Sequence, residues 1–126
     1  MNGSGGDGNF YHLAHLDVVP GKREEFLREL NAVMMRSVKE EGLVRCEIFQ
    51  SDSRPDRISI LDVFESKDAF ELHLRQSYLA EFQKQTVGLL DGGERDVLNL
   101  LVRGKNAVPS TAERMGEGDA GRSIEA

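Results

Sequence analysis

The spacing of the apolar residues changes several times between residues 10 and 102, and these changes restrict the fold more than any other feature. Four segments alternate apolar and polar residues or form short apolar runs, as β-strands do; they are residues 10–18, 43–51, 58–65 and 94–102. Two segments carry apolar residues three and four positions apart, as amphipathic helices do; they are residues 22–40 and 66–90. This order predicts a ferredoxin-like α+β fold, βαββαβ, with a four-stranded antiparallel sheet and helices on one face.

Turn and cap residues stand at the ends of these segments. Pro20-Gly21 ends the first strand, and Asp91-Gly92-Gly93 ends the second helical segment, which Gln76-Ser77 interrupts. Gly42 stands where the end of a helix favours a left-handed residue, and Ser66 can cap the second helix. The predicted apolar stripe of the first helix consists of Phe26, Leu30, Val33, Met34 and Val38.

The two ends of the chain lack this periodicity. Residues 1–9 contain four glycines, and residues 103–126 contain four basic and four acidic residues among small side chains. Such segments bury too little apolar surface to offset the conformational entropy lost on ordering. We therefore expect one folded domain at residues 10–102, flanked by disordered tails at residues 1–9 and 103–126.

Composition excludes several classes of protein. The 16 basic and 22 acidic residues give a net charge of -6, which argues against binding to nucleic acid or to anionic membranes. A single cysteine, Cys46, and only three histidines argue against an internal disulfide and a metal site. No apolar run reaches the roughly 20 residues of a membrane span, and the N-terminus lacks the apolar core of a signal peptide. These features predict a soluble, cytoplasmic protein.

Alternation along the strands predicts which side chains face the helices. The helix-side set is Phe10, His12, Ala14, Leu16, Val18, Cys46, Ile48, Ile58, Ile60, Asp62, Phe64, Leu98, Leu100 and Val102. The outer set includes seven hydrophobic residues, Tyr11, Leu13, Phe49, Leu61, Val63, Val97 and Leu101. Because a sheet face open to water is usually polar, this outer face predicts a homodimer whose sheets pack face to face. The alternative is a monomer with scattered surface hydrophobes.

Several polar groups are predicted on the buried side, where a plain core would have none. An imidazole and a carboxylate facing one cavity can form a proton relay, and a phenol can polarise a substrate oxygen. We therefore predict that His73 is a general base, that Asp62 orients it, and that Tyr78 binds the substrate oxygen. The residues predicted to contact the substrate are His12, Cys46, Phe64 and Phe82. Alternatively, these polar groups are hydrogen-bonded parts of a filled core, with Asp62 paired to Arg57.

Three stretches of the chain resemble the antibiotic biosynthesis monooxygenase (ABM) family: VPGKREEFLREL, SVKEEGLVRCEIFQS and ILDVFESKDAFELHLRQSYLAEF. The resemblance extends over residues 10–102 and implies a dimeric α+β barrel. Members of this family oxidise quinols or polyketide phenols with dioxygen, usually without a metal or flavin. The resemblance therefore implies a small-molecule substrate and no cofactor.

The motif residues of the family correspond to particular residues of this chain. The Glu-x-Trp at the end of the third strand corresponds to Asp62-Val63-Phe64, the helix histidine to His73, and a second histidine to Tyr78. Relatives that degrade haem carry an Asn, a Trp and an axial His near the positions of Ala14, Phe64 and Gln83. The resemblance therefore disfavours haem degradation.

Three functions remain as hypotheses. The first is a cofactor-independent monooxygenase that oxidises a small quinol or another enolisable aromatic substrate. The second is an isomerase of a small hydroxyketone related to autoinducer-2 processing; a phosphorylated substrate would need a cation such as Arg45, Arg57 or Arg75. The third is a non-catalytic dimeric module, ligand-binding or stress-associated, whose cavity is filled by side chains.

Overall fold

A computed structural model describes residues 6–92, 96–106 and 108–109 of the chain. The order of its elements is β1 (Phe10–Asp17), α1 (Arg23–Ser37), β2 (Leu43–Gln50), β3 (Arg57–Phe64), α2 (Lys67–Leu74), α3 (Ser77–Thr86), the short 3₁₀ helix η1 (Val87–Leu89) and β4 (Asp96–Leu101). Of the predicted tails, residues 1–5 and 110–126 lie outside the described residues, as does the start of the predicted fourth strand at residues 94–95.

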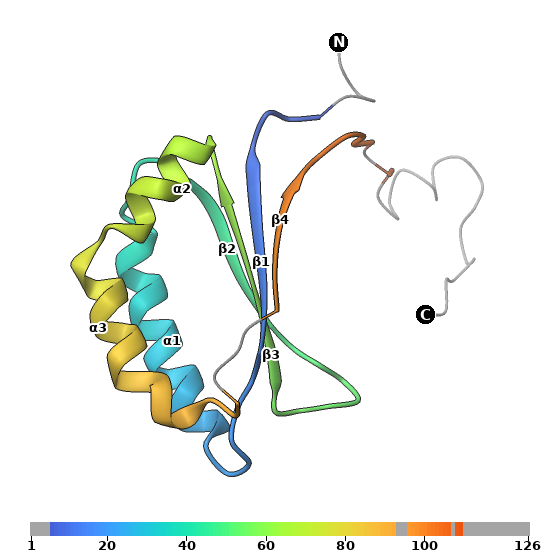
Figure 1. The fold of residues 1–126 in the computed structure, drawn as a ribbon. Helices are drawn as coiled ribbons and strands as arrows, with labels where there is room; N and C mark the ends of the chain where they lie inside the picture. Colours follow the sequence, from blue (N-terminus) through green and yellow to red (C-terminus); the bar gives the residue numbers. More distant parts are fainter. Residues whose placement is uncertain (1–5, 93–95, 107, 110–126) are drawn as a thin grey trace.

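The four strands form one antiparallel sheet in the order β2-β3-β1-β4. All helices lie on the same face of this sheet, with α1 and α3 side by side along it and α2 at the end nearest the N-terminus of β1 (Figure 1). The predicted ferredoxin-like α+β fold is therefore confirmed. The second helical segment is interrupted where the sequence predicts it, because Gln76 adopts an extended conformation between α2 and α3.

The register of the sheet aligns the predicted helix-side residues of β1, β2 and β3. His12 lies opposite Asp62, and Asp62 lies opposite Cys46 on its other side. Asn99 of β4 lies opposite His12, so four polar side chains form one row across the helix-facing side of the sheet. We call these four residues, His12, Cys46, Asp62 and Asn99, the polar row.

Strand β4 has the opposite parity from the prediction. The residues that share the helix side with β1 are Val97, Asn99 and Leu101. Alternation in the sequence assigns Leu98 and Leu100 to that side, together with Val102, and this assignment is wrong. The run VLNLLV is apolar at both parities, so its pattern does not determine the register, and a shift of one residue moves every side chain to the other face. Val102 lies beyond the end of the strand.

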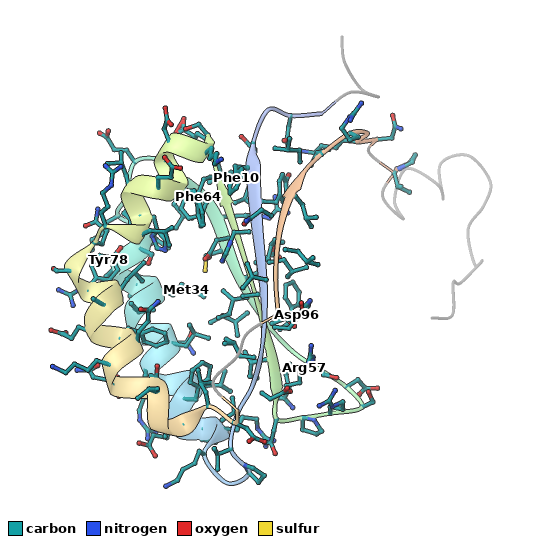
Figure 2. All side chains as sticks on the ribbon, in the orientation of Figure 1. Phe10, Met34, Arg57, Phe64, Tyr78 and Asp96 are labelled. Carbon is teal, nitrogen blue, oxygen red and sulfur yellow. The ribbon has the colours of Figure 1, made fainter. Side chains whose placement is uncertain are left out.

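The core consists of two clusters rather than one. The first lies under α1 and contains Leu16, Val18, Phe26, Leu30, Ile58 and Leu89. The second lies under α2 and contains Phe10, Phe64 and Phe70. Side chains of both layers meet between the helices and the sheet, with Phe10 and Phe64 at one end (Figure 2). The space between the two clusters holds the cavity described below.

The first helix is shorter than its sequence pattern predicts. It ends at Ser37, and Val38, which the sequence assigns to the apolar stripe, is 54% exposed at the C-cap. The chain then turns, so Glu40 leaves the helix axis and approaches α2. Gly42 does not adopt the predicted left-handed conformation. It is needed for another reason, because a Cβ atom at this position would lie 2.4 Å from the Cβ of Ala69.

Residues just outside the predicted domain make specific contacts. The hydroxyl of Tyr11 donates to Asp7 Oδ2 over 2.7 Å, and Lys105 Nζ lies 3.3 Å from the same oxygen. The hydrogen bond from Tyr11 lowers the pKa of Asp7 to about 2. In the part of the chain that the structure describes, no helix is both long enough and apolar enough to cross a bilayer.

Candidate active site

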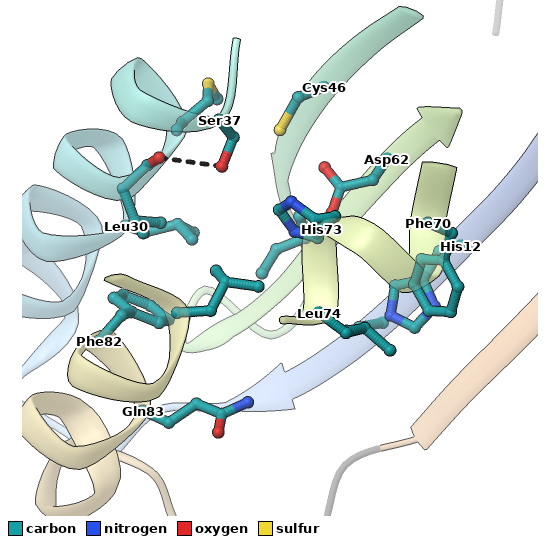
Figure 3. A pocket seen from close by; sticks show the side chains of 15 residues that line it. His12, Leu30, Ser37, Cys46, Asp62, Phe70, His73, Leu74, Phe82 and Gln83 are labelled. Atoms are coloured by element: carbon teal, nitrogen blue, oxygen red, sulfur yellow. Dashed lines mark hydrogen bonds between the residues drawn. The ribbon is translucent and has the colours of Figure 1, made fainter. Parts of the chain in front are cut away.

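A cavity of about 90 Å³ lies between the sheet and the helices, and we call it the sheet–helix cavity. Its floor is formed by β1, β2 and β3 and its walls by α1, α2 and α3 (Figure 3). Leu30 of the first core cluster lines one side and Phe70 of the second cluster lines another. Five of the seven predicted site residues line the cavity: His12, Cys46, Asp62, His73 and Phe82.

Three members of the polar row form the floor of the cavity. His12 Nδ1 lies 2.9 Å from Asn99 Oδ1, so this nitrogen donates to the amide oxygen. The imidazole of His12 also stacks on Phe70, with 4.8 Å between the ring centroids. Burial and the neighbouring Asp62 carboxylate raise the pKa of the Cys46 thiol well above its usual range. A raised pKa keeps a thiol protonated, and the thiolate is the nucleophilic form, so this setting does not favour Cys46 as a nucleophile.

His73 reaches the cavity from α2 and is held by Glu40, which no sequence pattern indicates as a site residue. Its Nδ1 lies 2.9 Å from Glu40 Oε2, and its ring packs on Phe64 with 5.1 Å between centroids. A carboxylate can only accept, so Nδ1 carries the proton and Nε2 is left able to accept one. Both partners are shielded from water, since the side chains of His73 and Glu40 are only 9% and 16% exposed.

His73 therefore pairs with Glu40 and not, as the sequence predicts, with Asp62. Asp62 remains on the floor of the cavity, beside Cys46 in the polar row (Figure 3). Nor does it pair with Arg57, whose guanidinium instead bonds Asp17 on the outer face at 3.1 Å. Alternation could not reveal Glu40, because its position depends on where α1 ends and how the following turn runs.

Tyr78 does not point into the sheet–helix cavity. Its hydroxyl donates to Glu40 Oε2, the same oxygen that His73 bonds. Its ring lines a groove between α1 and α3, and the guanidinium of Arg36 lies 5.0 Å from the ring centroid. Burial and the hydrogen bond to Glu40 raise the pKa of Tyr78, so its hydroxyl stays protonated and keeps donating. The predicted contact of Tyr78 with a substrate oxygen has no support in this geometry.

Phe64 also differs from its predicted role. It is completely buried and is not among the residues lining the cavity; it packs behind His73 and Phe70. It therefore supports the imidazole from behind. Phe82 does line the cavity, where its ring packs on Phe26 with 6.1 Å between centroids.

The charge of the cavity limits the substrates that it can hold. No lysine or arginine lines it in the described part of the chain. Arg45 and Arg57 lie on the outer face of the sheet, where they pair with Glu47 and Asp17. A phosphorylated substrate would thus enter without a cationic partner other than an imidazole. Among the described residues, no three His, Cys, Asp or Glu side chains are grouped to hold a metal ion.

The chain matches the family model described as antibiotic biosynthesis monooxygenase over residues 9–85. No curated protein matches it. A protein of Nitrosomonas europaea, provisionally described as an antibiotic biosynthesis monooxygenase, is 16% identical with a TM-score of 0.72, and the match covers 81% of this chain and 95% of that one.

Two further solved structures share the fold. A conserved protein of Methanosarcina mazei is 19% identical with a TM-score of 0.69, over 79% of this chain and 93% of that one. A protein of Pseudomonas aeruginosa is 20% identical with a TM-score of 0.68, over 81% and 98%. At these identities the likeness shows the fold alone.

Proposed function

Since the chain belongs to the antibiotic biosynthesis monooxygenase family, we propose that it is a cofactor-independent monooxygenase for a small quinol or another enolisable aromatic substrate. The observation that carries this proposal is the hydrogen bond between His73 Nδ1 and Glu40 Oε2. It leaves Nε2 of a cavity-lining imidazole as the proton acceptor. A base of this kind is what a reaction that begins with deprotonation of a phenol or enol requires.

The reaction consumes one dioxygen and releases one water. His73 removes a proton from the activated position of the substrate, and the resulting carbanion-like anion forms a carbon–oxygen bond with dioxygen. The hydroperoxide anion takes back the proton from the imidazolium. The activated position is a methylene, as in an anthrone or in the keto tautomer of a phenol, and cleavage of the oxygen–oxygen bond with loss of water converts this methylene into a carbonyl. The substrate supplies all of the electrons, so the balance needs no added reductant.

The other residues of the cavity have binding roles in this proposal. Asp62 and His12 lie side by side in the polar row and can bind substrate hydroxyl groups. Cys46 and Phe82 add polarisable and apolar contacts at the two sides of the cavity. Glu40 orients His73 without touching the substrate, so it is a positioning residue.

We further propose that the protein is a homodimer joined through the outer face of the sheet. This face carries Phe49, Leu98 and Leu100, which are 48%, 44% and 43% exposed. Leu98 and Leu100 pair with Leu13 and Tyr11 of β1. Apolar patches of this kind on a sheet face commonly mark an interface. The dimeric barrel implied by the family resemblance would use this same face.

Oxygen consumption by the purified full-length chain tests the proposed reaction. A panel of hydroquinones and anthrone-like substrates should be oxidised in air and left unchanged under argon. Labelled dioxygen should place one oxygen atom in the product and the other in water. His73→Ala should lower the rate by about 100-fold or more. Turnover that survives both argon and His73→Ala would contradict the proposal.

A matched control separates chemistry from folding. His15→Ala removes an imidazole from β1 that lies on the outer face and bonds Ser59 Oγ over 2.7 Å. It should keep the oxidation rate of the wild-type protein. Solvent deuterium entering a hydroxyketone without oxygen uptake would instead indicate an isomerase that uses the same base.

A further inference from the structure

A second cavity, of about 220 Å³, lies at the other end of the helical layer. Its walls carry no charged side chain in the described part of the chain, and five of its lining residues are aliphatic or aromatic: Leu16, Phe26, Phe82, Val87 and Leu90. The hydroxyl of Thr86, which also lines it, is already satisfied by the carbonyl oxygen of Phe82 at 2.8 Å. This second cavity therefore offers space and apolar contact without a free ionisable partner.

The two cavities are adjacent. Phe82 and Gln83 of α3 line both of them, and no other described residue does. Both side chains lie at the end of the sheet–helix cavity away from Cys46 and Asp62 (Figure 3). Gln83 is exposed, and exposed side chains change rotamer readily, so its position does not close the boundary. The polar row and the second cavity thus lie on opposite sides of these two residues.

We propose that the second cavity binds a hydrocarbon substituent of the substrate, whose polar aromatic head occupies the sheet–helix cavity. This inference rests on the proposed function and adds a substrate class to it: phenols or quinols that carry an alkyl or isoprenoid chain. The head meets hydrogen-bonding groups at Asp62 and His12, while the chain passes Phe82 toward Leu16 and Leu90. Burial of each added methylene in such a site favours binding by about threefold to fourfold.

Binding of 4-alkylphenols to the full-length chain tests this inference without turnover. Isothermal calorimetry on a series from 4-methylphenol to 4-heptylphenol should give dissociation constants that fall by about threefold per methylene until the cavity is full. Intermolecular NOEs should connect the terminal methyl of 4-pentylphenol to the methyl groups of Leu16, Val87 or Leu90. Dissociation constants independent of chain length, or NOEs from the chain only to other residues, would overturn the inference.

Two tryptophan variants place the effect in the second cavity. Val87→Trp adds bulk at a lining residue that is 66% exposed, so the larger side chain should fill the cavity at little cost in folding. Val38→Trp adds the same bulk at a residue that is 54% exposed and lines none of the cavities described above. Val87→Trp should abolish the gain per methylene but leave 4-methylphenol binding unchanged, and Val38→Trp should keep the gain.

The outcomes separate this inference from the proposed function. Chain-length dependence that Val87→Trp removes, in a protein that consumes no oxygen, would support the second cavity and contradict the monooxygenase. Oxygen consumption without chain-length dependence would support the monooxygenase and contradict the second cavity as a binding site. If Val87→Trp keeps the dependence, NOEs to Leu16 and Leu90 would still support the inference, and their absence would overturn it.

Discussion

Glu40 and His73, separated by 33 positions in the chain, are joined by a hydrogen bond of 2.9 Å between Oε2 and Nδ1. The bond connects the turn after α1 to the last turn of α2. The same carboxylate oxygen accepts from Tyr78 at the start of α3. One acidic side chain therefore holds the orientation of the candidate base and ties together all three helices that cover the sheet.

Replacing Glu40 by Gln should disturb the tautomer of His73 before it disturbs the fold. The amide can present either a donor or an acceptor to Nδ1, so it no longer requires this nitrogen to carry the proton. We expect the ¹⁵N chemical shifts of His73 to show a loss of the Nδ1–H tautomer and the oxidation rate to fall by about tenfold or more. Both effects come from the same cause and should appear in the same variant.

Glu41→Gln is the matched control for this prediction. It makes the same chemical change at the next residue, which is exposed and for which the structure records no side-chain bond to His73. It should leave the ¹⁵N shifts and the rate unchanged. An unaltered tautomer in Glu40→Gln would mean that Glu40 does not orient the imidazole.

Cys46 should resist alkylation in the folded protein. Burial first, and then the Asp62 carboxylate, raise the pKa of its thiol far above the ordinary value of 9.0, so little thiolate forms. Iodoacetamide at about pH 8 should therefore modify the native protein much more slowly than the urea-unfolded protein. Alkylation of the native protein as fast as that of the unfolded chain would show that the thiol is accessible and ionised.

The same raised pKa should make stability fall at alkaline pH. Above the ordinary value of 9.0 the unfolded chain loses the thiol proton while the folded protein keeps it, which favours unfolding. This contribution is intact below about pH 9 and is lost as the pH rises further. Because Cys46 is partly exposed, we expect a loss of about 1 kcal/mol by about pH 10, measured as the difference between wild type and Cys46→Ala in urea unfolding.

Sequence patterns were sufficient for the fold because most elements have a strong local signal. In β1 the buried residues Phe10, Ala14 and Leu16 share one parity. Ser66 forms the expected helix cap, because its Oγ accepts a hydrogen bond from the backbone N–H of Ala69 at 3.1 Å. Strand β4 lacks such a signal, since apolar residues occupy both of its faces. Its parity is therefore determined by pairing with β1, which a single sequence does not reveal.

The candidate site was only partly predictable for a related reason. His12, Cys46 and Asp62 lie on strands whose alternation determines their face, so they could be placed together. Glu40 lies in a turn, and its contact with His73 depends on α1 ending at Ser37. Turn geometry and contacts between distant segments have no periodicity, so the residue that orients the candidate base was not identified.

Gly42→Ala should destabilise the protein because of a neighbour on α2. A Cβ at Gly42 would lie 2.4 Å from the Cβ of Ala69, closer than two carbon atoms can approach. We expect the free energy of unfolding to fall by about 1–3 kcal/mol. Gly88→Ala is the control, because a Cβ there meets nothing within 4 Å.

A double-mutant cycle with Ala69→Gly checks the cause of this effect. Ala69→Gly removes the methyl group that Gly42→Ala would meet, at its own cost of about 1 kcal/mol for a glycine in a helix. The double variant should lose less free energy of unfolding than the sum of the losses in the two single variants. Simple additivity would show that Gly42 is needed for its backbone conformation instead.

The proposed dimer predicts that one charge on β4 should separate the protomers. Leu98 pairs with Leu13 on the outer face of the sheet and is 44% exposed in the single chain. Leu98→Lys would bury an ammonium group in an apolar interface, whereas a monomer would tolerate the same lysine in water. Sedimentation equilibrium should therefore give the wild type twice the chain mass of 14.0 kDa and the variant the mass of one chain.

Leu72→Lys, at a residue of α2 that is 57% exposed, makes the same change away from this face and should leave the dimer intact. A wild-type protein that sediments as one chain at micromolar concentration would contradict the dimer but not the sheet–helix cavity, which a single chain forms.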